Sequence, residues 1–330
     1  MLDRRHILIV FTLLGLGVGI VVPAQAQEKY QDKYPSRPIR LLVPFPAGGP
    51  VDVMGRLIGQ RLSSTLGQQV IVENRPGGGS TLAARAAATA DPDGYTLLLA
   101  SAASLAIGPA LYNNIGYDPA TSFAPIAFVS SVPYVMIAGP KVQAKTVPDL
   151  IAYAKANPGK LNVGVPNGAP PHMIAAWFRS ATKTDIVIVP YKGASNVITD
   201  LIGGQIDLGF ETTSVTFGHV HEGKVKALGV ATQARLVDLP DVPTMIEGGV
   251  PDFIASSWTG LMAPAGTPKE IVTRLNAELN AGLVSSEMKE RFRMLAAEAH
   301  PGTPADFMAF IVKEIPKWQA MAKLAGVKAE

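Results

Sequence analysis

Short apolar runs alternate along this chain with longer segments in which apolar residues recur every three or four positions. The first pair is an apolar run at 39–45 followed by a helical spacing from Val51 to Leu66, which predicts a strand and then a helix. The first block contains predicted strands at 39–45, 69–73 and 95–100 and predicted helices at 51–66, 80–90 and 104–113. The second block contains predicted strands at 161–165, 185–190, 206–210 and 226–230 and predicted helices at 147–156, 171–182, 195–203 and 214–222. This alternation indicates an α/β protein with mixed or parallel sheets flanked by helices.

Two further stretches, 124–138 and 255–263, have an extended pattern, and the chain is then helical at 267–283, 286–296 and 303–324. We interpret the extended stretches as two strands by which the chain crosses from one lobe to another and returns. These strands would form a hinge, the C-terminal helices would pack on the first lobe, and the cleft between the lobes would be the site. The predicted lobes are residues 36–130 plus 256–330 and residues 131–255.

The first 26 residues have the pattern of a secretory signal peptide. Arg4 and Arg5 form a short positive region, residues 7–22 are apolar or glycine apart from one threonine, and Ala24-Gln25-Ala26 is a cleavage site of the small-x-small type. A membrane span needs about 20 apolar residues, so this run is short for an anchor. We therefore predict a signal peptide at 1–26, cleaved near Ala26, and a periplasmic mature protein. The arginine pair leaves both the ordinary and the twin-arginine export routes open.

The composition narrows the class of protein. With 330 residues, 48% of them apolar and 17% charged, the chain is long and apolar enough for two globular domains. The formal net charge is only +3 and no basic stripe is present, so we expect no nucleic-acid partner. The chain has no cysteine, which excludes disulfides and thiol catalysis and fits a bacterial periplasm.

The most informative segment is the glycine turn at 44–52, between the first strand and the first helix. A helix N-terminus presents unpaired N–H groups and a partial positive charge, so it can bind an anion. The turn lacks the lysine, serine or threonine that a nucleotide phosphate loop supplies. We interpret it as a site for a small carboxylate held by backbone amides. The alternative is a plain tight turn capped by Asp52.

Other candidate loops follow the carboxyl ends of the predicted strands, where open α/β sheets bind ligands. They are 101–104, 166–172, 191–196 and 211–214. Ser101 and Ser104 offer hydroxyls, Asn167 offers an amide, and Tyr191 offers an aromatic wall. Glu211 is the single acid at the end of a β-run, where a carboxylate would suit an ammonium or hydroxyl group of a ligand. For each loop, an ordinary turn or a helix cap is the alternative.

Catalytic and metal-binding patterns find little support in the sequence. His219 and His221 lie on different faces of the predicted helix, with no cluster of partner ligands, so a solvated helix end is the better interpretation. His172 follows Pro171 at a helix start and could cap that helix or line the cleft. No nucleophile elbow, dinucleotide fingerprint or phosphate loop is present. We therefore expect a protein that is not an enzyme and has neither cofactor nor catalytic residues nor a metal site.

From Tyr34 to about residue 325 the chain resembles the solute receptors of tripartite tricarboxylate transporters, the Bug receptor family. The motifs that carry the resemblance are YPSRPI at 34–39, VPFPAGG at 43–49, VENRPG at 72–77, DGYTL at 93–97, VPYKG at 189–193, LPDVPT at 239–244 and APAGTP at 263–268. The resemblance implies a two-lobed periplasmic binding protein of the Venus flytrap type. It would capture a dicarboxylate, a tricarboxylate, an acidic amino acid or an aromatic acid and deliver it to membrane subunits of the transporter. We expect it to act as a monomer.

The resemblance also implies which residues contact the ligand. The first-lobe contacts would be Phe45, Ala47, Gly48, Gly49, Asp52, Ser101, Ala102 and Ala103. The second-lobe contacts would be Asn167, Gly168, His172, Tyr191 and Glu211. In such receptors backbone amides and ordered water hold the ligand carboxylate without an arginine clamp.

The chain departs from the family pattern at three positions that touch this site. Pro50 replaces a serine or threonine and removes a backbone donor, Ala169 to Pro171 replace a Gly-Ser pair, and Glu211 replaces an aspartate. The ligand can therefore differ from those of familiar members. Two rival functions remain at this point, an enzyme that uses the same cleft and a receptor that docks on a periplasmic sensor domain.

Overall fold

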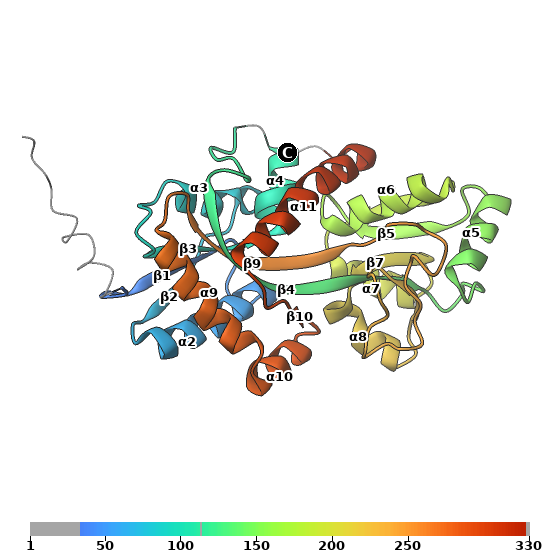
Figure 1. Ribbon diagram of the computed structural model, residues 1–330. Coiled ribbons are helices and arrows are strands. Elements are labelled where there is room, and N and C mark those ends of the chain that lie inside the picture. Colours follow the sequence, from blue (N-terminus) through green and yellow to red (C-terminus); the bar gives the residue numbers. More distant parts are fainter. Residues whose placement is uncertain (1–33, 113, 328–330) are drawn as a thin grey trace, which may run out of the picture. The chain divides into compact units, whose positions relative to one another are not determined.

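The computed structural model describes residues 34–112 and 114–327, and the residues from Pro35 onward belong to one compact unit (Figure 1). The predicted signal peptide and its cleavage site lie outside the described residues. Within the described ranges, no helix combines the length and the apolar character needed to cross a membrane.

The first group of strands begins with three parallel strands, β1 (Ile39–Val43), β2 (Val70–Asn74) and β3 (Thr96–Ser101), in the order β2-β1-β3. Leu41, Leu42 and Val43 are buried in succession, as expected for a parallel strand covered on both faces. The helical segments of this group are α2 (Pro50–Leu66), the 3₁₀ turn η1 (Gly78–Ser80), α3 (Thr81–Ala88), η2 (Ala103–Ile107) and α4 (Gly108–Leu111). The apolar stripe of α2 packs on β1 and β2, and the helix ends at Gly67, whose φ of 69° is left-handed.

The second group repeats this arrangement with the parallel strands β5 (Asn162–Pro166), β6 (Val187–Tyr191) and β7 (Leu208–Thr212), in the order β7-β5-β6. An additional strand, β8 (Lys226–Val230), runs antiparallel to β4 (Phe123–Ala138). The helices of this group are α5 (Val147–Ala156), α6 (Pro170–Thr182), α7 (Ala194–Ile202) and α8 (Thr213–His221).

Two antiparallel strands, β4 (Phe123–Ala138) and β9 (Ser256–Pro264), join the groups. The first part of β4, up to Pro133, pairs with β9, and its last part, from Tyr134, pairs with β7. β9 in turn pairs with β3, so the strands form one continuous mixed sheet flanked by helices. The α/β class is therefore confirmed, with the qualification that the two predicted sheets are joined through β4. The division into lobes at 36–130 plus 256–330 and 131–255 stays a prediction.

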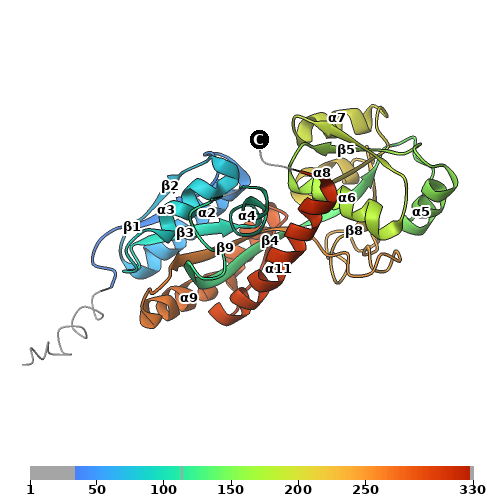
Figure 2. The same ribbon diagram turned by 90° about the horizontal axis from the view of Figure 1, so that it is seen from above.

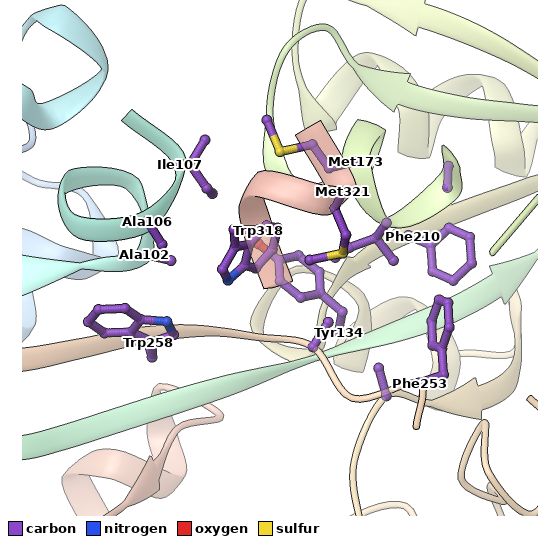
Figure 3. Packing of buried hydrophobic residues seen from close by; sticks show 14 of the residues in the cluster. Ala102, Ala106, Ile107, Tyr134, Met173, Phe210, Phe253, Trp258, Trp318 and Met321 are labelled. Carbon is purple, nitrogen blue, oxygen red and sulfur yellow. The ribbon is translucent and has the colours of Figure 1, made fainter. Parts of the chain in front are cut away.

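The C-terminal part contributes α9 (Lys269–Leu283), α10 (Ser286–Met294), the two-residue strand β10 (Glu298–Ala299) and α11 (Pro304–Ala325). α9 packs on α2 and β4, whereas α11 contacts η2 and β4 and also α6 of the second group (Figure 2). Figure 3 shows Trp318 and Met321 of α11 lying between Ile107 on one side and Met173 and Phe210 on the other. One cluster of buried apolar residues therefore spans both groups of strands.

A buried carboxylate fixes α11 to β9. Glu314 is 5% exposed, and its Oε2 accepts hydrogen bonds from the indole N–H of Trp258 at 3.0 Å and of Trp318 at 2.8 Å. Lys317 forms an ion pair with Glu314 and donates to the carbonyl oxygen of Ile254 at 3.4 Å, just before β9. Both oxygens of the buried acid are thereby satisfied, as a buried charge requires.

Several predicted boundaries are wrong. The predicted helix at 104–113 is a π-helical segment, η2, followed by a short α4, because Pro109 lacks the N–H that a regular helix needs. The strand predicted at 206–210 is β7 at Leu208–Thr212, so Glu211 lies within the strand and not in the loop after it. The helix predicted at 286–296 ends at Met294 and is followed by β10, which was not expected.

Candidate functional site

The predicted contact residues form two sets, each at the carboxyl edge of one group of parallel strands. In the first set, Phe45 to Gly49 connect β1 to α2, and Ser101 to Ala103 lie where β3 ends. In the second set, Asn167 follows β5, Tyr191 ends β6 and Glu211 lies near the end of β7. The carboxyl edges of parallel strands are where α/β folds place ligands, so both sets lie where a site is expected.

The turn between β1 and α2 is held in shape by Asp52. This side chain is only 2% exposed, and its Oδ2 accepts hydrogen bonds from the Gly48 N–H at 2.8 Å and from Arg56 Nε at 3.0 Å. Gly48 has a φ of 85°, a left-handed value that glycine adopts without strain. The structure therefore supports the alternative that Asp52 closes a tight turn, and the Gly48 N–H is already engaged.

Asn74, at the end of β2, completes this arrangement and was not among the predicted site residues. Its Nδ2 donates to Asp52 Oδ1 at 2.9 Å and to the carbonyl oxygen of Phe45 at 3.0 Å. Asn74 lies in the VENRPG motif at a strand carboxyl end, and that position was the signal that could have identified it. The turn is thus braced from α2 by Asp52 and from β2 by Asn74.

The charge state of Asp52 follows from these contacts. Burial alone would raise the pKa of its carboxyl, but the hydrogen bonds from Arg56, Gly48 and Asn74, together with the Arg56 charge, lower the pKa to about 2. Asp52 is therefore a carboxylate at neutral pH, in the first turn of α2, where the helix dipole favours a negative charge. Because Pro50 occupies the first helical position, that position supplies no N–H to a ligand.

Ser101 and its neighbours form a compact turn between β3 and η2. The Ser101 N–H donates to Ser104 Oγ at 2.9 Å, and that hydroxyl donates back to the carbonyl oxygen of Ser101 at 3.1 Å. Ala102 is buried and Ala103 is half-buried. The Ser104 N–H also donates to Ser101 Oγ at 3.4 Å, so both serine side chains shape the turn.

In the second group, the loops after β5 and β6 are tied together. The Asn167 N–H donates to the carbonyl oxygen of Tyr191 at 2.9 Å, and Gly168 N–H donates to His172 Nδ1 at 3.4 Å. Burial and the nearby Arg179 charge lower the pKa of His172, so its ring is neutral at pH 7. The Tyr191 hydroxyl donates to Asp200 Oδ2 at 2.7 Å, so this side chain offers its ring and not its hydroxyl to a ligand.

Glu211 has a different environment from Asp52. It is 4% exposed, and its Oε1 has no hydrogen-bond partner. Burial raises the pKa of its carboxyl to about 7, although a hydrogen bond from the Thr212 backbone works in the opposite direction. The two acids among the predicted contacts therefore differ in charge state near neutral pH.

Histidines and acids do not gather into a metal-binding cluster in the part of the chain that the structure describes. Among residues 34–112 and 114–327, no group of three or more histidines and acids could hold a metal ion. A cavity of about 350 Å³ lies between α8, α10 and β10, and none of the predicted contact residues lines it.

Comparison with known proteins identifies the family. The sequence model described as "Tripartite tricarboxylate transporter family receptor" matches residues 54–327. The protein BugT of Bordetella pertussis is 36% identical over 329 residues, which cover 99% of each chain.

Solved structures agree with this family. Rpa4515 of R. palustris, solved with adipate, is 35% identical with a TM-score of 0.74, over 89% of this chain and 99% of that one. MatC of Rhodopseudomonas palustris, with bound malate, is 32% identical with a TM-score of 0.70, over 87% of this chain and 99% of the MatC chain. These likenesses confirm the fold of a periplasmic binding protein. The chain belongs to the receptor family of tripartite tricarboxylate transporters, which are periplasmic solute-binding proteins and not enzymes.

Proposed function

We propose that this receptor captures a small dicarboxylate and delivers it to the membrane subunits of a tripartite tricarboxylate transporter. Receptors of the family bind small molecules and work with transporter components. The choice of a dicarboxylate rests on two relatives that share about a third of their residues with this chain. One was solved with adipate and the other with bound malate, and both acids are dicarboxylates.

The geometry of the first carboxyl edge supports a binding turn that is already formed. The turn at 45–49 is fixed by Asp52 and Asn74 before any ligand arrives, so binding need not order it. Phe45 and Ala47 would contact the ligand from this turn, together with the backbone of Gly49. Asp52 would act as a positioning residue that reaches the ligand only through the Gly48 backbone.

The second carboxyl edge would supply the remaining contacts. Asn167 is exposed and can donate from its side chain, while Gly168, His172 and the Tyr191 ring would form the wall of the cleft. Ser101, Ala102 and Ala103 would complete the first edge. The two edges would close on the ligand as lobes of residues 36–130 plus 256–330 and 131–255, with β4 and β9 as the hinge. The closed state would be favoured by its higher affinity for the ligand.

A thermal-shift screen of organic acids tests the ligand class, because a ligand that binds only the native state raises the melting temperature. We expect a rise with adipate, malate or a related dicarboxylate in the mature protein, and calorimetry then gives the affinity. Light scattering during size exclusion tests whether the loaded receptor is a monomer. The absence of any shift across dicarboxylates, tricarboxylates and aromatic acids would contradict the proposal.

Docking on the transporter is tested separately, with the membrane subunits in vesicles. Uptake of labelled dicarboxylate should require the receptor and should be abolished when the receptor is omitted. Uptake that proceeds equally well without the receptor would contradict the transport role and favour a sensing role.

A further inference from the structure

Glu211 lies at the carboxyl edge shared by β5, β6 and β7 and is one of the ligand contacts that the family resemblance predicts. It is 4% exposed, its Oε1 has no hydrogen-bond partner, and no ion pair within the described ranges involves it. A buried carboxylate without a cation or a full set of donors is costly by several kcal/mol. The side chain therefore has a buried polar atom without a partner, near the strand end where a ligand is expected.

The surroundings of Glu211 are apolar on its own face of the sheet. In the pairing of β7 with β4, Val135 is opposite Glu211 and Ile137 is opposite Gly209, and both partners are buried. Val135 and Ile137 belong to one apolar cluster with Val197 of α7 and Val230 of β8. Neighbours of this kind supply no charge and no donor to the free oxygen.

Ionisable groups on the elements that pack against β7 do not supply a cation either. These elements are β4, β5, α6, α7 and α8. Their ionisable groups are Tyr134 on β4, His172 and Arg179 on α6, Asp200 on α7, and His219 and His221 on α8. Burial, together with the Glu211 charge, raises the pKa of Tyr134, and the lowered pKa of His172 keeps that ring neutral at pH 7. Arg179 and the two histidines of α8 belong to the last turns of their helices, and none of their charges shifts the pKa of Glu211.

A neutral and a charged Glu211 would select different ligands. The charged form repels a ligand carboxylate and suits an ammonium group, whereas the neutral form can donate its proton to a carboxylate oxygen. We propose that Glu211 meets a carboxylate oxygen of the bound acid as a neutral carboxyl group and donates its proton into that hydrogen bond. Where the empty receptor has lost this proton, ligand binding takes one from solvent. This inference rests on the proposed function and narrows the ligands of the receptor to acids that present no ammonium group to Glu211.

Calorimetry with adipate and with malate, from about pH 6 to about pH 9, tests the coupling. Burial raises the pKa of the free carboxyl to about 7, so above it the affinity of the natural protein should fall about tenfold per pH unit. At about pH 8, titrations in two buffers of different ionisation enthalpy should show uptake of close to one proton per ligand. Glu211→Gln keeps the shape and a donor, so it should bind with little pH dependence and take up no proton.

Glu298→Gln is the matched control, because burial also raises the pKa of Glu298, which lies in β10 on the first group of strands. It should retain the pH slope of the natural protein. An affinity that rises with pH, or a Glu211→Gln variant that keeps the natural slope, would overturn the inference and leave the proposed function intact. If neither acid binds at any pH, both the proposed function and this inference fall.

Discussion

Asp52→Asn is the substitution that most directly tests how the glycine turn is held. The amide has the shape of the carboxylate but carries no charge, and it cannot accept at both positions from Gly48, Arg56 and Asn74. One donor is therefore left unpaired in a site that is 2% exposed. We expect the variant to be less stable than the natural protein and to hold the turn less firmly.

The size of the effect follows from the pKa of the Asp52 carboxyl, lowered from 3.8 to about 2. A difference of this size corresponds to about 2 kcal/mol of stabilisation. Because the pKa is lower in the folded protein, this stabilisation is present above about pH 4 and is lost as the pH falls through about 2. The difference between the natural protein and the variant should be about 2 kcal/mol at pH 7 and roughly half of that at pH 3.

Urea denaturation followed by tryptophan fluorescence measures this difference at both pH values. Asp241→Asn, in an exposed segment, is the matched control and should change the free energy of unfolding by less than about 0.5 kcal/mol. Binding of the dicarboxylate should weaken on the order of tenfold in Asp52→Asn, since the turn must then be ordered by the ligand. A stability difference that is the same at pH 3 and pH 7, or an unchanged affinity, would refute the reasoning.

Three further predictions concern other parts of the chain. Gly260→Ala should lower the free energy of unfolding, measured in urea, by about 1–3 kcal/mol, because the new methyl group would overlap the Phe307 ring. The control is Gly218→Ala in an open part of α8, which should leave the free energy of unfolding unchanged or raise it by up to about 1 kcal/mol. Glu314→Gln should lower the melting temperature measured by circular dichroism, because the amide has no charge for the two buried indoles and Lys317 and turns an NH2 group toward the Lys317 ammonium. An unchanged melting temperature would show that the charge of Glu314 adds nothing to stability. The pKa of Glu211 is raised from 4.5 to about 7 in the folded protein, so its contribution to stability is full below pH 4.5 and is lost as the pH rises through 7. Relative to Glu211→Gln, the free energy of unfolding of the natural protein should fall by up to about 3 kcal/mol over this pH range. Parallel pH–stability curves for the two proteins would contradict this assignment.

The regular parts of the fold could be predicted from the sequence because they are local. β1 is a mostly apolar run, α2 has apolar residues at a period of 3.6, and the turn between them has Gly48, whose left-handed φ of 85° favours glycine. The π-helical segment η2 could not be predicted in this way. Its apolar spacing resembles that of a regular helix, and only the position of Pro109 signals the departure.

The candidate site could be located from the sequence but not built from it. The ends of the predicted strands indicate which loops belong to the site. The glycine turn at 45–49, however, is held in place by Asn74, which lies 22 residues from Asp52 in the sequence. The apolar pattern predicts too early a start for β7, because Ile206 continues that pattern. The carboxylate of Asp207, which accepts from the Asn162 N–H at 2.7 Å, marks the true beginning of that strand. Contacts of this kind, between segments far apart in the sequence, produce no periodic pattern of apolar residues.

The position of α11 has a consequence for how the chain reaches its final state. This helix is synthesised after every other described helix and strand, yet Phe307, Trp318 and Met321 lie in the apolar cluster that spans both groups of strands. The cluster therefore stays incomplete until α11 has been made, and a polypeptide still in synthesis exposes the surfaces that this helix covers. A premature stop codon before α11 would remove Phe307, Trp318 and Met321 from the apolar cluster that both groups share and would leave the rest of that cluster uncovered.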